Sequence, residues 1–291
     1  MLELCLLPPQ QGAFFYDEDH VYFYEGSAGK VRVPSSSHII ALGGGKDFDH
    51  DRWRQSLMRK GLNEKGANYF MERVRDIRAA VGTEFHACVE SKLTAVDFAP
   101  GCAERDEIFC LWLEKVFPRI GKVYIIEKPM IHPGGCYGFT PDLVAEIDGV
   151  LSLCDWKTNQ AEHFAERYER LTAYAPGDEI LHGVCKHLAE ADARAGKVRE
   201  VTARVRSGWQ MQQGSYAFGL EAVHGLRVQR GINFMLSVDG VKEHCWNRPD
   251  LEQGWVQFAG GLLLHHQREV INGGHPVFQA ALNALYPLMH A

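Results

Sequence analysis

The sequence contains no run of about 18 or more apolar residues, so no segment is long and apolar enough to span a membrane. Its first residues, Met-Leu-Glu-Leu-Cys-Leu-Leu-Pro-Pro, lack the basic start and the small-residue cleavage site of a secretory signal peptide. We therefore expect a cytoplasmic protein that makes no contact with a membrane.

Cysteine pairs with metal-binding spacing are also missing. The eight cysteines are scattered along the chain without any Cys-x-x-Cys. Such pairs are typical of zinc ribbons, and dense cysteine frameworks are typical of small secreted domains. The sequence therefore predicts free thiols in a reducing compartment.

An excess of positive charge is absent as well, since the formal net charge is -6. This balance argues against a protein that coats nucleic acid without specificity. Basic residues nevertheless outnumber acidic ones from Lys46 to Arg78 and from Arg194 to Arg230, which is compatible with local phosphate contacts. With 291 residues, 46% of them hydrophobic and 23% charged, the chain has the composition of a globular protein with a substantial core.

The stretch from Thr140 to Thr158 predicts a β-hairpin. Its Asp148-Gly149 dipeptide has apolar and β-branched residues on both sides, a strong indication of a two-residue turn. Counting outwards from that turn pairs Asp142 with Asp155. Directly opposed residues hold their Cβ atoms about 4.5–5.5 Å apart, so the two carboxylates would repel each other unless a cation lay between them. A hard divalent cation such as Mg²⁺ commonly takes one or two carboxylates and completes its shell with water and substrate phosphate.

Lys157 lies two residues beyond Asp155, so the two side chains point to the same face of the strand. An ammonium group there is suited to hold or deprotonate an attacking water and to offset developing negative charge. The alternative interpretation is that these charged residues form an ordinary solvated face of a hairpin.

A helical segment, interrupted near Gly61 to Gly66, is predicted from about residue 51 to residue 93. Apolar residues recur there at spacings of three and four and form one buried stripe. The stripe consists of Phe70, Val74, Ile77, Val81, Phe85, Val89 and Leu93. Beside it, Gly82, His86 and Glu90 share another face. A glycine inside a helix costs about 1 kcal/mol relative to alanine and often marks close packing or a ligand. His86 is therefore a candidate metal ligand, and a hydrogen-bonded structural histidine is the alternative.

Five short motifs then follow one another in a fixed order. They are Gly82-Thr-Glu-Phe-His86, Glu127-Lys-Pro129, Gly138-Phe-Thr-Pro-Asp142, Asp155-Trp-Lys-Thr158 and Gln212-x-x-x-Tyr216. In this order they resemble the RecB-like, phage-type exonucleases of the PD-(D/E)xK nuclease superfamily, over roughly residues 75 to 240. The resemblance implies an α/β fold with a restriction-endonuclease-like core. In that core a central mixed sheet carries the acidic ligands on a hairpin, flanked by the histidine helix and the Gln-x-x-x-Tyr helix.

The resemblance also implies roles for individual residues. His86, Asp142, Asp155 and the main-chain carbonyl of Trp156 correspond to the metal ligands. Lys157 corresponds to the catalytic lysine.

Five further residues complete the implied site. Gln212 and Tyr216 correspond to a pair that braces the lysine and the substrate phosphate. Glu127, expected inside a strand from residue 122 to residue 131, orients a water or a second metal ion. Thr83 and Thr158 contact phosphate through their hydroxyl groups.

The expected cofactor is Mg²⁺ or Mn²⁺. Some members of the superfamily also carry an iron–sulfur cluster held by one early cysteine and three late ones. In this chain Cys245 is the one cysteine beyond Cys185, so we expect no iron–sulfur cluster.

We expect one compact unit with three regions. Residues 1–74 form an N-terminal β-hairpin, over about residues 13–33, and a helical region packed on the core. Residues 75–248 form the nuclease core, with a helical insertion at about residues 159–208. Residues 249–291 form C-terminal helices.

The predicted function is that of a metal-dependent DNA exonuclease, which hydrolyses phosphodiester bonds in DNA recombination, DNA repair or the processing of phage DNA. DNA ends or single strands are the expected substrates, and a recombination protein or a single-strand-binding protein is a candidate partner. Three alternatives stay open. One is an endonuclease with the same core, and another is a catalytically silent nuclease fold that binds nucleic acid. The third is an unrelated α/β protein in which the motifs coincide by chance and Asp142 and Asp155 lie far apart.

Overall fold

The computed structural model describes residues 2–16, 21–26, 29–43, 50–96, 103–158, 164–195 and 207–285. Its strands are β1 (Glu3–Leu4), β2 (Ala13–Tyr16), β3 (Val21–Gly26), β4 (Gly29–Val33), β5 (Ile120–Ile126), β6 (Met130–His132), β7 (Tyr137–Phe139), β8 (Leu143–Ile147), β9 (Val150–Thr158), β10 (Arg230–Ser237) and β11 (Gly240–Asn247). Its helices are α1 (Ser36–Leu42), α2 (His50–Arg59), α3 (Glu64–Thr94), α4 (Ala103–Lys115), the 3-10 turn η1 (Phe117–Arg119), α5 (Phe164–Tyr174), α6 (Glu179–Arg194), α7 (Ser207–His224), α8 (Arg248–Ile271) and α9 (Pro276–Leu285). Within these ranges, no helix has both the length and the apolar character needed to cross a membrane.

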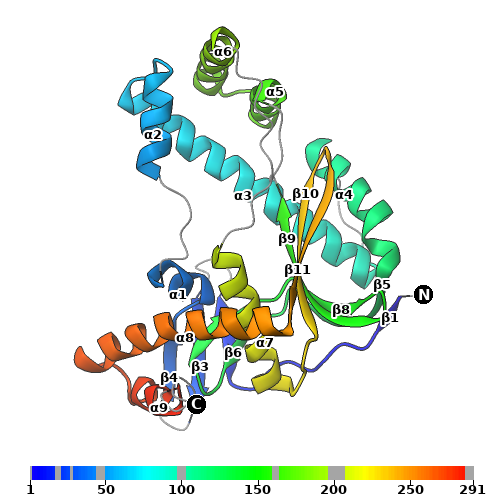
Figure 1. Ribbon diagram of the computed structural model, residues 1–291, viewed down its shortest axis with the longest axis vertical. Helices are drawn as coiled ribbons and strands as arrows, with labels where there is room; N and C mark the ends of the chain where they lie inside the picture. The colour runs from blue at the N-terminus through cyan, green and yellow to red at the C-terminus, as the bar shows by residue number, and fades with distance from the viewer. Residues whose placement is uncertain are drawn as a thin grey trace.

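A six-stranded sheet in the order β1-β5-β8-β9-β10-β11 lies at the centre of the molecule (Figure 1). The pairs β1/β5 and β9/β10 are parallel, and the other neighbours are antiparallel. The protein is therefore an α/β protein with a central mixed sheet flanked by helices. Because parallel strands need a long crossover, the chain passes through α5, α6 and α7 between β9 and β10.

The hairpin formed by β8 and β9 has the predicted register. Ile147 pairs with Val150 and the ladder continues outwards to the pair Leu143–Cys154. Asp148 and Gly149 both have positive φ, at 52° and 77°, which a two-residue turn of type I′ requires at its two central residues. Asp142, which directly precedes β8, and Asp155 on β9 come next, beyond the last pair.

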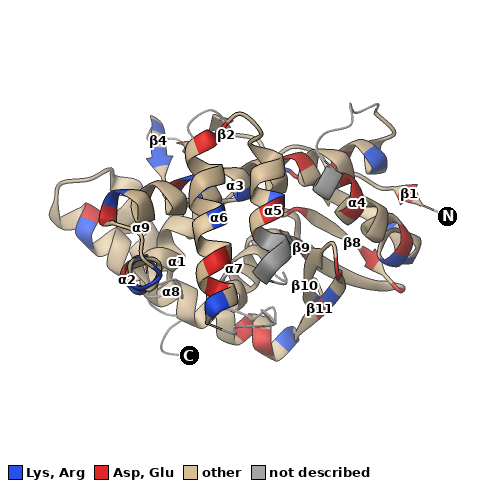
Figure 2. Ribbon diagram, turned by 90° about the horizontal axis from the view of Figure 1, so that it is seen from above, with Lys and Arg blue, Asp and Glu red and all other residues tan. Residues whose placement is uncertain are grey.

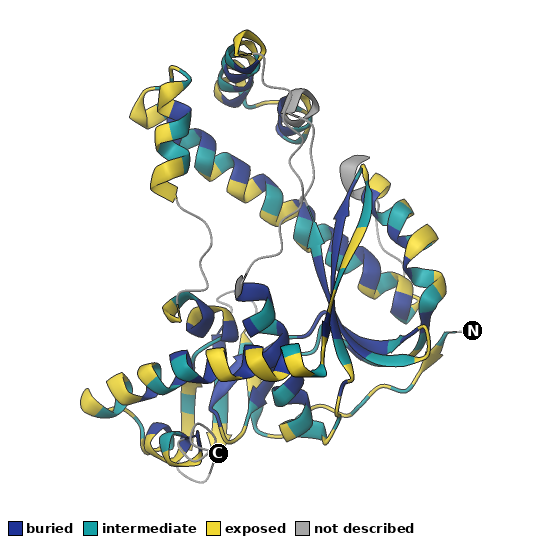
Figure 3. Ribbon diagram, in the orientation of Figure 1, coloured by how far each residue is buried: buried dark blue, intermediate teal, exposed yellow. Residues whose placement is uncertain are grey.

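Helices cover both faces of the sheet, because successive side chains of a strand point to opposite faces. On β8, Leu143 and Ala145 belong to a core that includes α3 and α4. Val144, between them, belongs to a second core that includes α1, α7 and α8. Figure 3 shows the central strands mostly buried. The hairpin is therefore held between α3 and α7.

Helix α3 buries the predicted apolar stripe along its full length. All seven residues of the stripe are buried. The side chain of Asn63 caps its start by accepting a hydrogen bond from the amide of Gly66, and Ala95 ends it with a φ of 57°. The C-terminal half lies against the sheet, and the N-terminal half extends away from it beside α2, α5 and α6 (Figure 1). The helix thus connects two packed regions of the molecule.

The expected insertion contains α5 and α6, whereas its end segments, residues 159–163 and 196–206, lie outside the described residues. An ion pair of 2.7 Å between Lys60 and Asp192 joins α6 to the turn between α2 and α3. A second, of 2.8 Å, joins Arg73 on α3 to Asp178 at the start of α6. These contacts hold the two helices against the N-terminal half of α3.

The N-terminal β-structure is a three-stranded sheet, because β2 adds to the expected hairpin of β3 and β4. Tyr22 lies over Gly138, where an added Cβ would come within 2.0 Å of the tyrosine ring, so only glycine fits. The hydroxyl of Tyr22 also bonds Thr140 Oγ1 at 2.7 Å. The N-terminal sheet therefore packs directly against the segment that leads to Asp142.

Two glycines allow α7 and α8 to cross closely. A Cβ at Gly254 of α8 would lie 2.1 Å from the carbonyl oxygen of Gln210, and one at Gly214 of α7 would lie 2.3 Å from the amide nitrogen of Trp255. Side chains at either position would force the helices apart. This crossing determines where α7 presents Gln212 and Tyr216.

Candidate metal centre

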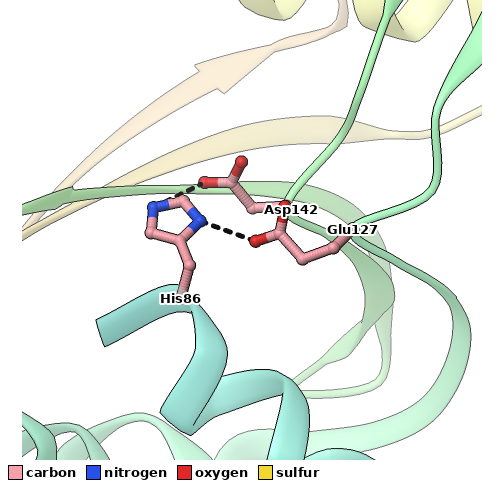
Figure 4. A group of neighbouring side chains, drawn as sticks. All are labelled: His86, Glu127 and Asp142. Atoms are coloured by element: carbon pink, nitrogen blue, oxygen red, sulfur yellow. Dashed lines mark hydrogen bonds and ion pairs between the residues drawn. The ribbon is translucent and has the colours of Figure 1, made fainter. Parts of the chain in front are cut away.

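Three titratable side chains from separate parts of the chain lie close together at the end of the β8–β9 hairpin that is opposite its turn (Figure 4). His86 belongs to α3, Glu127 follows β5 and Asp142 precedes β8. Nδ1 of His86 lies 2.6 Å from Oε1 of Glu127, and Nε2 lies 3.8 Å from Oδ2 of Asp142. One ligand atom from each residue lies within 4.8 Å of the others, which makes the group a candidate metal centre.

The position of Glu127 corrects the predicted strand from residue 122 to residue 131. That strand is broken, because β5 ends at Ile126 and β6 begins at Met130. Glu127 has a φ of 42°, a left-handed conformation that strands do not use. Pro129 contributes to the break, since proline has no amide hydrogen for a strand ladder. The turn at Glu127 directs its side chain to His86.

The electrostatics of the centre favour a cation. Burial acts to lower the pKa of His86, but the carboxylates of Asp142, Glu127 and Asp155 outweigh it and raise this pKa to about 9. Burial raises the pKa of Asp142, as do Asp155 and Glu127, while His86 opposes the shift. Burial and Glu127 also raise the pKa of Glu90. Several carboxylates therefore lie close together and repel one another, with few cationic groups among them. A divalent cation bound there would reduce this repulsion.

Asp155 lies beside this group and has other partners. The ammonium of Lys157 donates to its Oδ1 at 2.8 Å and lies 2.7 Å from its Oδ2. Asn233 donates to the same Oδ2 at 2.6 Å. The hairpin ends are tied together by the amide of Trp156, which donates to Oδ2 of Asp142 at 2.7 Å. Asp155 and Lys157 thus lie side by side on one face of β9, as their spacing predicts.

The predicted glutamine and tyrosine extend this network across α7. Lys157 donates to Oε1 of Gln212 at 3.2 Å, and Nε2 of Gln212 donates to the hydroxyl of Tyr216 at 3.1 Å. The hydroxyl of Ser36, at the start of α1, donates to Tyr216 at 3.5 Å. The ring of Trp209 lies 5.9 Å from the lysine nitrogen. Helices α7 and α1 therefore hold Lys157 in place or support its partners.

Both predicted threonines lie near the contact of α3 with β9. Thr83 is exposed on α3 and Thr158 is half-buried at the end of β9. An added Cβ at Gly82 would lie 3.5 Å from Oγ1 of Thr158, so the glycine permits a close approach of the two elements. The contact made by Trp156 to the centre is through its amide, while its ring packs in the core with α3. The roles of Thr83, Thr158 and the Trp156 carbonyl stay predictions.

Sequence reasoning missed Asn233, which is fully buried on β10 and bonded to Asp155. It also missed Trp246 on β11, whose indole nitrogen donates to Oδ1 of Asn233 at 2.6 Å. A pattern in the sequence could have identified the asparagine, because it interrupts an apolar run from Ile232 to Leu236. A polar residue in such a strand needs a hydrogen-bond partner.

No protein-family model matches the chain, and a comparison with curated proteins likewise gave no match. The chemistry and geometry of the site residues are therefore what bears on function.

Proposed function

We propose that this protein is a metal-dependent deoxyribonuclease with a restriction-endonuclease-like core of the PD-(D/E)xK type, and that it acts as an exonuclease on DNA ends or single strands. The observation that carries the proposal is the approach of His86 to Asp142 at one end of the β8–β9 hairpin, with Asp155 and Lys157 paired beside them on β9. The motif order in the sequence supports it too. So does the arrangement of the helices, since the histidine helix α3 and the Gln-x-x-x-Tyr helix α7 lie on opposite faces of the sheet.

The residues present fit a divalent cation. Nε2 of His86 and Oδ2 of Asp142 lie 3.8 Å apart, wider than the roughly 3 Å between adjacent ligands of an octahedral cation with bonds of about 2.0–2.1 Å, so the two side chains would move slightly closer together on binding one. Glu127 contacts the other ring nitrogen, Nδ1, at 2.6 Å. Histidines that bind metals commonly donate this second N–H to a carboxylate, which fixes the ring orientation. We assign the ligand positions to His86, Asp142 and Asp155, and the orienting position to Glu127.

Each group would then have a defined role in hydrolysis. A divalent cation at this centre supplies a Lewis acid for a phosphoryl oxygen and a bound water of lowered pKa. Lys157 offers its N–H groups to the attacking water or to the developing negative charge. Gln212 holds the lysine at 3.2 Å and Tyr216 holds the glutamine, so the ammonium is oriented before substrate binds.

A second candidate function is nucleic-acid binding without catalysis. Lys157 forms an ion pair with Asp155. A lysine with a purely structural role would form the same pair, so the pair is compatible with this second function. Figure 2 shows acidic and basic residues interspersed along the ribbons of the helices in that view. The endonuclease alternative shares every site residue and differs in how DNA reaches the centre.

The deciding experiment is a digestion assay on end-labelled linear DNA and on circular DNA, each single-stranded and double-stranded. We expect cleavage of linear substrates with Mn²⁺ at least as readily as with Mg²⁺, because affinity for nitrogen-containing sites rises along the first transition row. EDTA and Asp142→Asn should abolish it. Cleavage of circular DNA would assign an endonuclease. Binding without cleavage under either ion would support the silent module instead.

A further inference from the structure

Asn233 is a polar side chain at the centre of the parallel pair β9/β10. It is fully buried, lies opposite Asp155 in the register of β9 and β10, and lies opposite His244 in the register of β10 and β11. Its neighbours on β10, Ile232 and Phe234, belong to the apolar core. A buried amide in such a strand is costly unless its donors and acceptor are bonded.

The orientation of this amide follows from its partners. The indole nitrogen of Trp246 is a donor only, and it lies 2.6 Å from Asn233. The atom that it contacts must therefore be the amide oxygen. The amide nitrogen is consequently directed to the other side, where it donates to Oδ2 of Asp155 at 2.6 Å. Trp246 thus determines which end of Asn233 faces the carboxylate.

This arrangement orients Asp155 as well. Its Oδ2 receives the amide of Asn233 and faces Lys157, while its Oδ1 receives, among the described residues, one hydrogen bond, from Lys157 at 2.8 Å. A carboxylate oxygen has two lone pairs, so Oδ1 keeps one for a further partner. The Asn233 contact holds the carboxylate through Oδ2, the other oxygen, and so leaves that lone pair unused.

We propose that Asn233, oriented by Trp246, is a positioning residue that holds the Asp155 carboxylate ready to bind a divalent cation; this rests on the proposed function, which makes Asp155 a metal ligand. Asn233 touches neither metal nor substrate and acts through Asp155. Partners that orient metal ligands in this way typically contribute about 10- to 100-fold to metal affinity.

The test compares Asn233→Ala, Asn233→Ser and Trp246→Phe with the wild-type protein. The control is Cys245→Ala, an exposed neighbour of Trp246 on the other face of β11. Calorimetry on the metal-free protein measures Mn²⁺ affinity, single-turnover assays measure cleavage at saturating Mn²⁺, and thermal unfolding measures folding.

We expect Asn233→Ala to weaken Mn²⁺ binding about 10- to 100-fold, with cleavage at saturating Mn²⁺ within about threefold of wild type. Trp246→Phe should also weaken Mn²⁺ binding, but by a smaller factor. Without the indole N–H, the amide of Asn233 is free to turn its oxygen to Asp155. Asn233→Ser moves the donor closer to the main chain and away from Oδ2 of Asp155, so it should also weaken Mn²⁺ binding, and it reports on affinity if the alanine variant does not fold.

Wild-type Mn²⁺ affinity in folded Asn233→Ala or Asn233→Ser would overturn the positioning role. If the wild-type protein binds Mn²⁺ and cleaves no DNA, the proposed nuclease function fails, and the affinities still decide the role of Asn233. Wild-type protein that binds no Mn²⁺ would overturn both.

Discussion

The His86 imidazole holds its proton to an unusually high pH, because the carboxylates of Asp142 and Glu127 face its two ring nitrogens. Its pKa of about 9 in the folded protein exceeds the ordinary value of 6.5. A group whose pKa is raised by folding stabilises the folded state fully below its unfolded pKa. That contribution is lost as pH rises through about 9. Binding of a metal ion to this imidazole should release its proton at neutral pH.

Glu127→Gln tests this coupling in the metal-free protein. The substitution removes a carboxylate 2.6 Å from Nδ1, so we expect the pKa of His86 to fall, as measured by NMR titration of the imidazole. The wild type should be more stable than the variant at pH 6, and the difference should shrink as pH rises through 9. Glu72→Gln, an exposed change on the same helix, is the control. An unchanged His86 pKa in Glu127→Gln would contradict the assignment.

Lys157→Ala separates catalysis from binding. Lysine is not a metal ligand in the proposed site, so Mn²⁺ affinity and DNA affinity should change little. Turnover should fall by a factor on the order of 10²–10⁴ if the ammonium takes part in proton transfer. Asp155→Asn should instead weaken metal binding, so part of its activity should return at high Mn²⁺. Single-turnover cleavage and DNA binding across a Mn²⁺ titration distinguish the two. Wild-type cleavage by Lys157→Ala would refute the nuclease mechanism.

Among the elements, α3 combines a structural role with the functional one proposed for His86. Its glycine at position 82 has room for a small side chain, because an added Cβ would make an ordinary contact of 3.5 Å with Thr158. We expect Gly82→Ala to raise the free energy of unfolding by up to about 1 kcal/mol through helix propensity. Gly82→Leu should lower it by roughly 1–3 kcal/mol, since the larger side chain pushes against β9. Urea denaturation measures both, with exposed Ala79→Leu as the control. Equal stability of the alanine and leucine variants would show that β9 does not approach Gly82.

At the scale of the whole molecule, polar contacts add to the apolar packing that holds α5, α6 and the turn between α2 and α3 together. Asp192 is buried and accepts hydrogen bonds from Lys60 and from the Tyr168 hydroxyl, both at 2.8 Å. The imidazole of His187 on α6 lies 2.9 Å from the carbonyl of Lys60. The two contacts made by Lys60 join segments that are more than a hundred residues apart in the chain.

Asp192→Ala should loosen this region and leave the sheet intact. Loss of the carboxylate removes an acceptor shared by the Tyr168 hydroxyl and the Lys60 ammonium, and a lost hydrogen bond to a charged group costs about 1–3 kcal/mol. Amide hydrogen exchange should therefore accelerate in α5, α6 and the α2–α3 turn, with β8 and β9 unchanged. Asp192→Asn keeps a hydrogen-bond acceptor and should have a smaller effect. Faster exchange in β8 and β9 would mean that the two regions unfold together.

The features that the sequence determined are those with local causes. Asp148-Gly149 selects the tight turn, and counting from it placed Asp142 and Asp155 next to each other in register. The spacing of apolar residues predicted α3 and its buried stripe, and an interval of two residues placed Lys157 beside Asp155. Each follows from backbone geometry over a few residues, which the chain encodes directly.

The tertiary structure decided which distant residues complete the site. The left-handed turn at Glu127, which brings its side chain to His86, depends on the packing of α3 and the path of the chain after β5. Asn233 reaches Asp155 only through the parallel pairing of β9 with β10, across 78 residues of chain. Parallel strands are not joined by a short turn, so the register of β9 and β10 cannot be found by counting residues from a turn. The path of the chain through α5, α6 and α7 determines which strand pairs with β9. For that reason the hairpin that brings Asp142 close to Asp155 could be predicted from the sequence, and the distant residues that contact these two carboxylates could not.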